Sequence, residues 1–220
     1  FATENNPNND NKFMEENLNL IQEWDKTFPQ SDKVNHKKIT FHNRYGITLA
    51  ADLYVPKNVT GKLPAIAISG PFGAVKEQAS GLYAQTLAER GFLTIAFDPS
   101  YTGESSGQPR YVASPDINTE DFSAAVDYLS TRDDVDAERI GILGICGWGG
   151  MALNAAAIDT RIKATVTATM YDMSRVNANG YFDSMNADAR HELRRQLNAQ
   201  RTEDYRNGTF ALGGGVVDPL

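Results

Sequence analysis

One stretch of the sequence decides the fold of the chain: residues 138–150 read ERIGILGICGWGG. Its apolar run predicts a strand that is buried on both faces, and the run leads through Gly144 into Cys146. The small residues that follow, MALNAAA at 151–157, predict a helix. A strand, a tight turn and a helix form a nucleophile elbow, in which small neighbours let the backbone turn sharply and expose a reactive side chain. Cys146 occupies the nucleophile position, two residues after Gly144.

The surroundings of Cys146 indicate a reactive thiol. A helix that begins directly behind it places backbone N–H dipoles near the sulfur, which favours the thiolate. Free cysteine is often a small buried hydrophobe, but a core cysteine does not need the four glycines found between residues 144 and 150. A second register places Trp148 at the tip of the turn and leaves no nucleophile. We favour Cys146 because it directly follows the strand.

The sequence on either side of this stretch predicts the rest of an α/β sheet. Buried runs without polar alternation, separated by helical segments, are typical of parallel strands that helices cover on both faces. The expected strands are 63–69, 92–97, 140–143 and 162–170, and the expected helices are 79–90, 119–130 and 148–158. Before them, an antiparallel hairpin is expected from residues 34–41 and 47–55, with a turn at 44–46.

A second piece of chemistry follows the first parallel strand, where residues 69–74 read SGPFGA. Acyl transfer through a tetrahedral intermediate needs two fixed N–H donors at the oxyanion, one after the nucleophile and one from this loop. Gly147 and Phe72 are the expected donors, because Pro71 has no N–H. On this segment alone, an ordinary Gly-Pro turn explains the sequence equally well. Residues 98–105, DPSYTGES, follow the next strand and are expected to shape the same edge of the sheet.

No histidine of the sequence is a convincing general base. In the chain order nucleophile, acid, histidine, the base follows Cys146, and only His191 does so. His191 falls on the polar face of a helix expected at 183–201. His36 and His42 belong to the first hairpin, far from the expected site.

Two acidic residues are weighed as partners of the thiol. Glu77 lies close to the expected oxyanion loop and could hold or deprotonate the thiol, although an exposed glutamate beside Lys76 is commonly a solvated charge. Asp172 follows the strand that ends at residue 170 and could serve as the acid of a triad.

The composition is that of a globular protein with one core. Of the 220 residues, 41% are hydrophobic and 22% are charged, so one domain is expected to bury a substantial core. The 21 basic and 28 acidic residues give a net charge of −7, which disfavours nucleic acid as a partner. No apolar run approaches the roughly 20 residues that a membrane-spanning helix needs. The single cysteine forms no internal disulfide.

Four stretches of the chain resemble bacterial α/β-hydrolases of the dienelactone-hydrolase-like branch: residues 39–54, 70–78, 96–105 and 144–150. The similarity covers roughly residues 33–172. It implies an α/β-hydrolase fold with the cysteine nucleophile at Cys146 and the oxyanion hole near Phe72 and Gly147. In that family the acid and the histidine lie in loops after later strands, which these 220 residues do not contain.

The expected organisation has four parts. They are a flexible tail at 1–12, a packing helix and linker at 13–32, the hydrolase core at 33–172, and a lid-like helix and loop at 173–220. No strand is expected after residue 170, so the sheet would end on an exposed hydrophobic edge. We therefore expect a truncated chain, whose missing C-terminal part supplies at least two strands and the base, within the gene product or as a separate fragment.

The expected function is hydrolysis of a carboxylic ester or lactone through an acyl-cysteine, with a small-molecule ester or acyl substrate. A thioesterase or an acyltransferase would use the same atoms. The alternative is a catalytically inactive hydrolase-fold module that binds an apolar ligand or another chain. Trp148 and the lack of a suitable histidine favour that alternative. No metal or organic cofactor is implied, and homo-oligomerisation stays open.

The start of the sequence bears on localisation. Phe1 and Ala2 fit the remnant of a signal-peptidase site followed by polar residues. Export to the periplasm or out of the cell is expected on this ground, with the cytoplasm as the alternative, since a trimmed fragment would begin in the same way.

Overall fold

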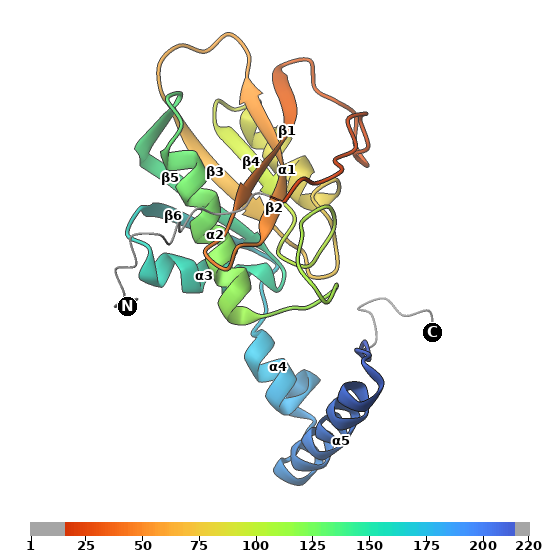
Figure 1. Ribbon diagram of the computed structural model, residues 1–220. Coiled ribbons are helices and arrows are strands. Elements are labelled where there is room, and N and C mark those ends of the chain that lie inside the picture. The colour runs from red at the N-terminus through yellow and green to blue at the C-terminus, as the bar shows by residue number, and fades with distance from the viewer. Residues whose placement is uncertain (1–15, 214–220) are drawn as a thin grey trace, which may run out of the picture.

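The computed structural model describes residues 16–213, and its centre is a six-stranded sheet. The strands are β1 (Val34–His42), β2 (Thr48–Pro56), β3 (Leu63–Ser69), β4 (Leu93–Phe97), β5 (Val135–Ile145) and β6 (Ile162–Ala168). They lie in the order β1-β2-β4-β3-β5-β6 (Figure 1). Strands β4, β3, β5 and β6 are parallel to one another, while β2 pairs antiparallel with both β1 and β4. The predicted, mostly parallel sheet with an N-terminal antiparallel hairpin is confirmed.

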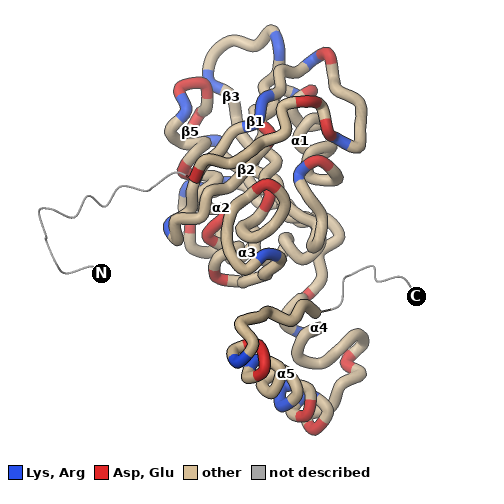
Figure 2. The backbone as a smooth tube through the Cα atoms, turned by 45° about the vertical axis from the view of Figure 1, so that its right-hand side comes forward, with Lys and Arg blue, Asp and Glu red and all other residues tan. Residues whose placement is uncertain are grey.

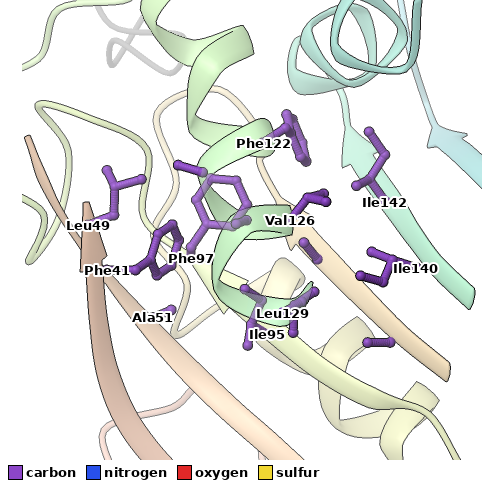
Figure 3. Close-up of a cluster of buried hydrophobic side chains, with 14 of the residues drawn as sticks. Phe41, Leu49, Ala51, Ile95, Phe97, Phe122, Val126, Leu129, Ile140 and Ile142 are labelled. Carbon is purple, nitrogen blue, oxygen red and sulfur yellow. The ribbon is translucent and has the colours of Figure 1, made fainter. Parts of the chain in front are cut away.

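Helices pack on both faces of the sheet, which explains why the parallel strands are apolar throughout. The helices of this layer are α1 (Ala79–Ala88), α2 (Pro115–Ser130) and α3 (Trp148–Ile158). Consecutive residues of β5 point into opposite cores, because Ile142 clusters with side chains of α2 and α3 whereas Leu143 clusters with side chains of α1. Figure 3 shows the first of these cores, in which Phe122 of α2 lies near Ile142 of β5.

The face that carries α1 is covered only in part. Helix α1 contacts β2, β3 and β4. Beside it lies a groove of about 460 Å³ lined by residues of α1, β3, β5 and β6, among them Tyr83, Ile66 and Val166. Within residues 16–213, β6 pairs only with β5, and Val166 is 54% exposed. The sheet of the described residues therefore ends on a partly exposed apolar strand.

The packing helix expected within residues 13–32 is wrong for its described part, because residues 16–33 form no helix. Several of their backbone N–H groups bond to distant parts of the chain. The N–H of Ile21 donates to Glu104 Oε1 at 2.8 Å, and the N–H of Thr27 donates to the Glu77 carbonyl at 3.0 Å. We call residues 16–33 the strap. The predicted tail at 1–12 lies outside the described residues.

Acid is expected to weaken the protein in part through Asp25 of the strap. Burial alone would raise the pKa of Asp25, but hydrogen bonds from Lys26 (2.6 Å) and Lys38 (2.8 Å) outweigh it and lower the pKa from 3.8 to about 2. A lowered pKa means that the unfolded chain binds this proton more readily, so the stabilisation is present above about pH 4 and is lost as the pH falls toward 2.

The measurement is the free energy of unfolding in urea for wild type and Asp25→Asn at pH 5 and pH 3. Because Asp25 is partly exposed to solvent, we expect the advantage of wild type to shrink by only about 0.5 to 1 kcal/mol between the two pH values. A constant difference between the two proteins would show that Asp25 does not have this lowered pKa.

Two further helices follow the sheet. A loop up to residue 180 and a single helix at 183–201 were expected there. The first, α4 (Met173–Asn179), replaces most of that loop. Asp172 caps it by accepting a hydrogen bond from the Arg175 N–H at 2.9 Å, and Gly180 ends it at φ +73°. A short 3₁₀ turn, η1 (Tyr181–Asp183), leads onward from there.

The second helix, α5 (Ala187–Asn207), begins and ends later than predicted. The side chain of Asn186 caps its first turn, and Gly208 ends it in the left-handed region at φ +65°. Helix α5 extends away from the sheet, has no buried residue and carries charges of both signs along its length (Figures 1 and 2). Its role as a lid stays a prediction.

None of the helices of residues 16–213 combines the length and the apolar character that crossing a bilayer requires.

Candidate active site

The turn between β5 and α3 has the strained backbone of a nucleophile elbow. β5 ends at Ile145, α3 begins at Trp148, and Cys146 between them has φ +58°. A residue other than glycine rarely adopts this left-handed backbone conformation, because it costs free energy unless surrounding contacts stabilise it. Here the Cys146 N–H donates to the Ala168 carbonyl of β6 at 2.9 Å, and the Cys146 carbonyl accepts from the Gly149 N–H at 3.0 Å. The thiol is partly exposed.

Two glycines let other backbone segments approach the elbow. A Cβ atom on Gly144 would lie 2.2 Å from the Trp148 carbonyl oxygen, so only glycine lets α3 start directly against β5. A Cβ atom on Gly70 would lie 2.3 Å from the Ile145 carbonyl oxygen, so the loop after β3 also rests on the elbow. We call residues 70–78 the β3 loop.

The β3 loop and the start of α3 lie against each other, and each carries a backbone N–H without an acceptor among residues 16–213. A Cβ atom on Gly147 would lie 3.6 Å from Phe72 Cδ2, and the Phe72 ring lies 5.6 Å from the Trp148 ring. Within residues 16–213, neither the Phe72 N–H nor the Gly147 N–H donates a hydrogen bond to the protein. Two free donors beside a nucleophile are the arrangement that an oxyanion hole requires.

Trp148 does not occupy the tip of the turn. It is only 4% exposed and belongs to the core between the sheet, α2 and α3. The register that places Trp148 at the nucleophile position is therefore wrong. The side chain that the strained turn leaves partly exposed is Cys146.

The segment after β6 covers the elbow, and its Tyr171 was not among the residues expected at the site. Burial raises the pKa of Tyr171, and the charge of the neighbouring Cys146 side chain raises it further. The phenol is therefore neutral at pH 7 and can donate to the sulfur. Met173 of the same segment also lies near the elbow, because its sulfur would be 3.2 Å from a Cβ atom on Gly147. The sequence feature that could have identified Tyr171 is its position shortly after a core strand.

The structure does not bring a histidine to the elbow. His36 and His42 lie on β1, four strand spacings from β5, which corresponds to roughly 19 Å. His36 Nε2 lies 2.7 Å from Asp52 Oδ1 on β2. His191 is exposed on α5. None of these positions suits a base for Cys146, as the sequence predicts.

Asp172 is engaged in capping α4 rather than in orienting a histidine. Its carboxylate accepts from the Ser174 hydroxyl at 2.6 Å and from the Arg175 N–H at 2.9 Å. These hydrogen bonds lower the pKa of Asp172, so the side chain is ionised at neutral pH. A role as a triad acid needs a histidine, and none of the three in the chain is placed to supply it.

A buried charge network surrounds Lys76, which is 1% exposed. Its Nζ lies 2.5 Å from Glu77 Oε1, 2.8 Å from Asp98 Oδ2 and 2.6 Å from Glu104 Oε2. Burial alone would lower the pKa of Lys76, but the charges of Asp98 and Glu77 outweigh it and raise the pKa, so the ammonium stays protonated. The expectation of a solvated Glu77 is wrong, because its carboxylate also lies 3.4 Å from Lys38 Nζ.

The same carboxylates are the described group best suited to surround a cation. One oxygen from each of Glu77, Asp98 and Glu104 lies within 4.8 Å of the others. The ammonium of Lys76 already contacts all three and supplies the positive charge. The cluster is therefore explained as an ion-pair network, and we assign no metal to it.

The chain is similar to several known proteins. The sequence profile of the X-Pro dipeptidyl-peptidase (S15) family matches residues 45–211. Uncharacterized protein PA2218 of Pseudomonas aeruginosa is 69% identical over 195 residues, which are 88% of this chain and 53% of the relative. Uncharacterized protein YcjY of Escherichia coli is 43% identical over 81% of this chain and 59% of the relative. The chain thus spans little more than half the length of these curated relatives.

More distant relatives have named activities. Thiohydrolase aneE of Aspergillus aculeatus is 29% identical over 62% of this chain and 42% of the relative. Among solved structures, hypothetical protein PA2218 from Pseudomonas aeruginosa matches with a TM-score of 0.88 and 65% identity, covering 92% of this chain and 66% of that one. Alpha/beta hydrolase GrgF from Penicillium sp. sh18 matches with a TM-score of 0.70 and 22% identity, covering 84% and 60%, and supports the fold alone. The α/β-hydrolase fold is confirmed, whereas the dienelactone-hydrolase-like branch stays a prediction.

Proposed function

Because the chain belongs to the X-Pro dipeptidyl-peptidase (S15) family, we propose that it carries the nucleophile of an α/β-hydrolase that cleaves a carboxylic ester, lactone or thioester through an acyl-cysteine. The observation that carries the proposal is the juxtaposition at the elbow. Cys146 is held at φ +58°, and the unused N–H groups of Phe72 and Gly147 lie beside it. The thiohydrolase among the relatives supports acyl chemistry at a site of this kind.

The proposed reaction begins with attack of the Cys146 thiolate on the substrate carbonyl carbon. The carbonyl oxygen becomes an oxyanion, which accepts hydrogen bonds from the Phe72 and Gly147 N–H groups. The intermediate collapses, the alcohol or thiol leaves with a proton, and a thioester to Cys146 remains. Water then attacks that thioester, which releases the carboxylic acid and restores the thiol. An acyltransferase would differ only in the acceptor that replaces water.

The second half of this reaction needs a general base to activate water, and the described residues do not place a histidine at Cys146. We propose that polypeptide beyond the described residues supplies that base, as the greater length of the relatives allows. In the chain alone, the acyl-cysteine is then expected to form faster than it is hydrolysed.

The test treats the chain with p-nitrophenyl acetate at pH 7.5. We expect a burst of p-nitrophenol that approaches one equivalent, followed by slow turnover, and a mass increase of one acetyl group that peptide mapping assigns to Cys146. Imidazole in the buffer is expected to speed the slow phase, because it replaces the missing base. The control is Cys146→Ala, which should show neither the burst nor this acetyl group.

A different result would support the alternative, a hydrolase-fold module that binds without catalysis. In that case the burst is absent, and Cys146 reacts no faster than a free thiol of the same pKa. Such a result would mean that this chain forms no acyl-cysteine, and it would leave the assignment of the fold unchanged.

A further inference from the structure

Among the contacts that hold the β3 loop, two anchors lie on either side of Phe72. The first is the contact of Gly70 with the elbow, where a Cβ atom would lie 2.3 Å from the Ile145 carbonyl oxygen. The second is Lys76, four residues after Phe72, whose backbone N–H donates to Asp98 Oδ1 at 2.8 Å. The position of the Phe72 N–H therefore depends on Lys76, although Lys76 makes no contact with the elbow within residues 16–213.

Lys76 makes the second anchor unusually strong because both of its ends bind the same carboxylate. Its ammonium lies 2.8 Å from Asp98 Oδ2, while its N–H takes the other oxygen. The side chains of Lys76 and Asp98 are both 0% exposed. Asp98 follows β4 directly, and its Oδ2 also accepts from the Glu104 N–H at 2.9 Å. One carboxylate thus joins the β3 loop to residues 98–104.

Burying these charges is costly, and well-packed apolar side chains of the same size are often as stable or more stable. The network gives the loop a fixed geometry that apolar packing would not specify. An oxyanion hole needs such fixed donors, because a displacement of about 1 Å can cost two orders of magnitude in rate.

We infer that Lys76 is a positioning residue for acyl transfer at Cys146, which acts by fixing the Phe72 N–H through its bonds to Asp98 and Glu104. This inference rests on the proposed function. Lys76 takes no part in proton transfer and does not touch the substrate, and its effect is confined to the step that develops an oxyanion.

Two reactions of the same thiol separate this role from a general loss of structure. Acylation by p-nitrophenyl acetate passes through an oxyanion, whereas alkylation by iodoacetamide displaces iodide and forms none. In Lys76→Met we expect acylation of Cys146 to slow by about 10- to 100-fold, while alkylation stays close to the wild-type rate. The ratio of the two rates is the readout, because a disordered elbow would change both.

Lys38→Met is the matched control. It removes another buried lysine from the same network, where Lys38 Nζ lies 2.7 Å from Glu104 Oε2. Lys38 lies on β1, and its contact with the β3 loop is the longer one, at 3.4 Å, to Oε1 of Glu77, which follows Lys76 in the sequence. Its ratio of rates is expected to equal that of wild type. If Lys76→Met does not fold, Glu104→Gln takes its place, because it weakens the Lys76 anchor at a partly exposed side chain and should lower the ratio in the same direction.

The outcomes are distinguishable. If wild type acylates at Cys146 and the two lysine variants show equal ratios, Lys76 has no positioning role although the proposed function stands. If wild type alkylates but does not acylate at Cys146, the proposed function fails and the positioning role fails with it. A lowered ratio in Lys76→Met alone supports the inference.

Discussion

Replacing Gly144 by alanine is expected to lower the free energy of unfolding by about 3 kcal/mol or more and to slow alkylation of Cys146. The new Cβ would lie 2.2 Å from the carbonyl oxygen of Trp148, 2.6 Å from its carbonyl carbon and 2.8 Å from Gly149 Cα. All three atoms are backbone, so no side-chain rotation relieves the clash. Helix α3 must move away from β5, which releases the strained conformation of Cys146. Urea unfolding and the rate of iodoacetamide labelling measure the two effects.

Gly150→Ala is the matched control for this substitution. Gly150 also belongs to the glycine-rich stretch, but it lies within α3, and nothing lies within 4 Å of a Cβ atom placed there. Alanine is the better helix former, so the variant is expected to be as stable as wild type or more stable by up to about 1 kcal/mol. Wild-type stability and labelling in Gly144→Ala would mean that β5 and α3 are not in this close contact.

The elbow and the parallel strands were predictable because their causes are local in the sequence. A strand covered on both faces has no polar alternation, so residues 63–69 indicate β3 by composition alone. The elbow combines such a strand with glycines at close spacing, and the steric reason for Gly144 lies in its near neighbours in the chain, Trp148 and Gly149. The sequences after β3 and after Cys146 also suggested Phe72 and Gly147 as N–H donors for an oxyanion, which stays a proposal.

The strap was not predictable in this way because its conformation is set by distant residues. Apolar residues at helical spacing suggested a helix, yet the N–H of Ile21 bonds to Glu104, 83 residues further along the chain. Ile21 remains 53% exposed, so the spacing did not reflect one buried face. Helix α4 was missed for a different reason, since it is only seven residues long and its signals are an Asp cap and a Gly end rather than an apolar stripe.

The charge network around Lys76 was also not predictable, because it too is formed by residues that are distant in the sequence. Lys76 and Glu77 are adjacent charged residues, which usually indicates a solvated surface. Their burial results from the convergence of β1, residues 98–104 and the strap, which lie far apart in the sequence. No local pattern encodes that convergence. Asp98 directly after a core strand was the one local signal, and it predicted a role in shaping the sheet edge without revealing its partner.

Asp98→Asn is therefore expected to be among the most damaging substitutions outside the elbow, with a loss of about 3 kcal/mol or more in the free energy of unfolding. Asparagine keeps the shape of the side chain but removes the charge that faces the fully buried ammonium of Lys76. One position of the side chain also changes from an acceptor to a donor. At the Oδ1 position it opposes the Lys76 N–H, and at the Oδ2 position it opposes both the Lys76 ammonium and the Glu104 N–H. There is no room for rearrangement, because Gly103 packs directly on the carboxylate.

A double-mutant cycle with Lys76→Met tests whether the loss arises from this pair. If each single substitution leaves the other charge buried without its partner, removing both charges must cost clearly less than the sum of the two single losses. Glu104→Gln serves as the comparison, since Glu104 is 17% exposed and solvent can compensate for its missing charge, so a loss of about 1 kcal/mol is expected. Strictly additive losses for Lys76 and Asp98, or equal losses for Asp98→Asn and Glu104→Gln, would contradict the central place of the Lys76–Asp98 pair. Urea unfolding at pH 7 measures all four variants under one condition.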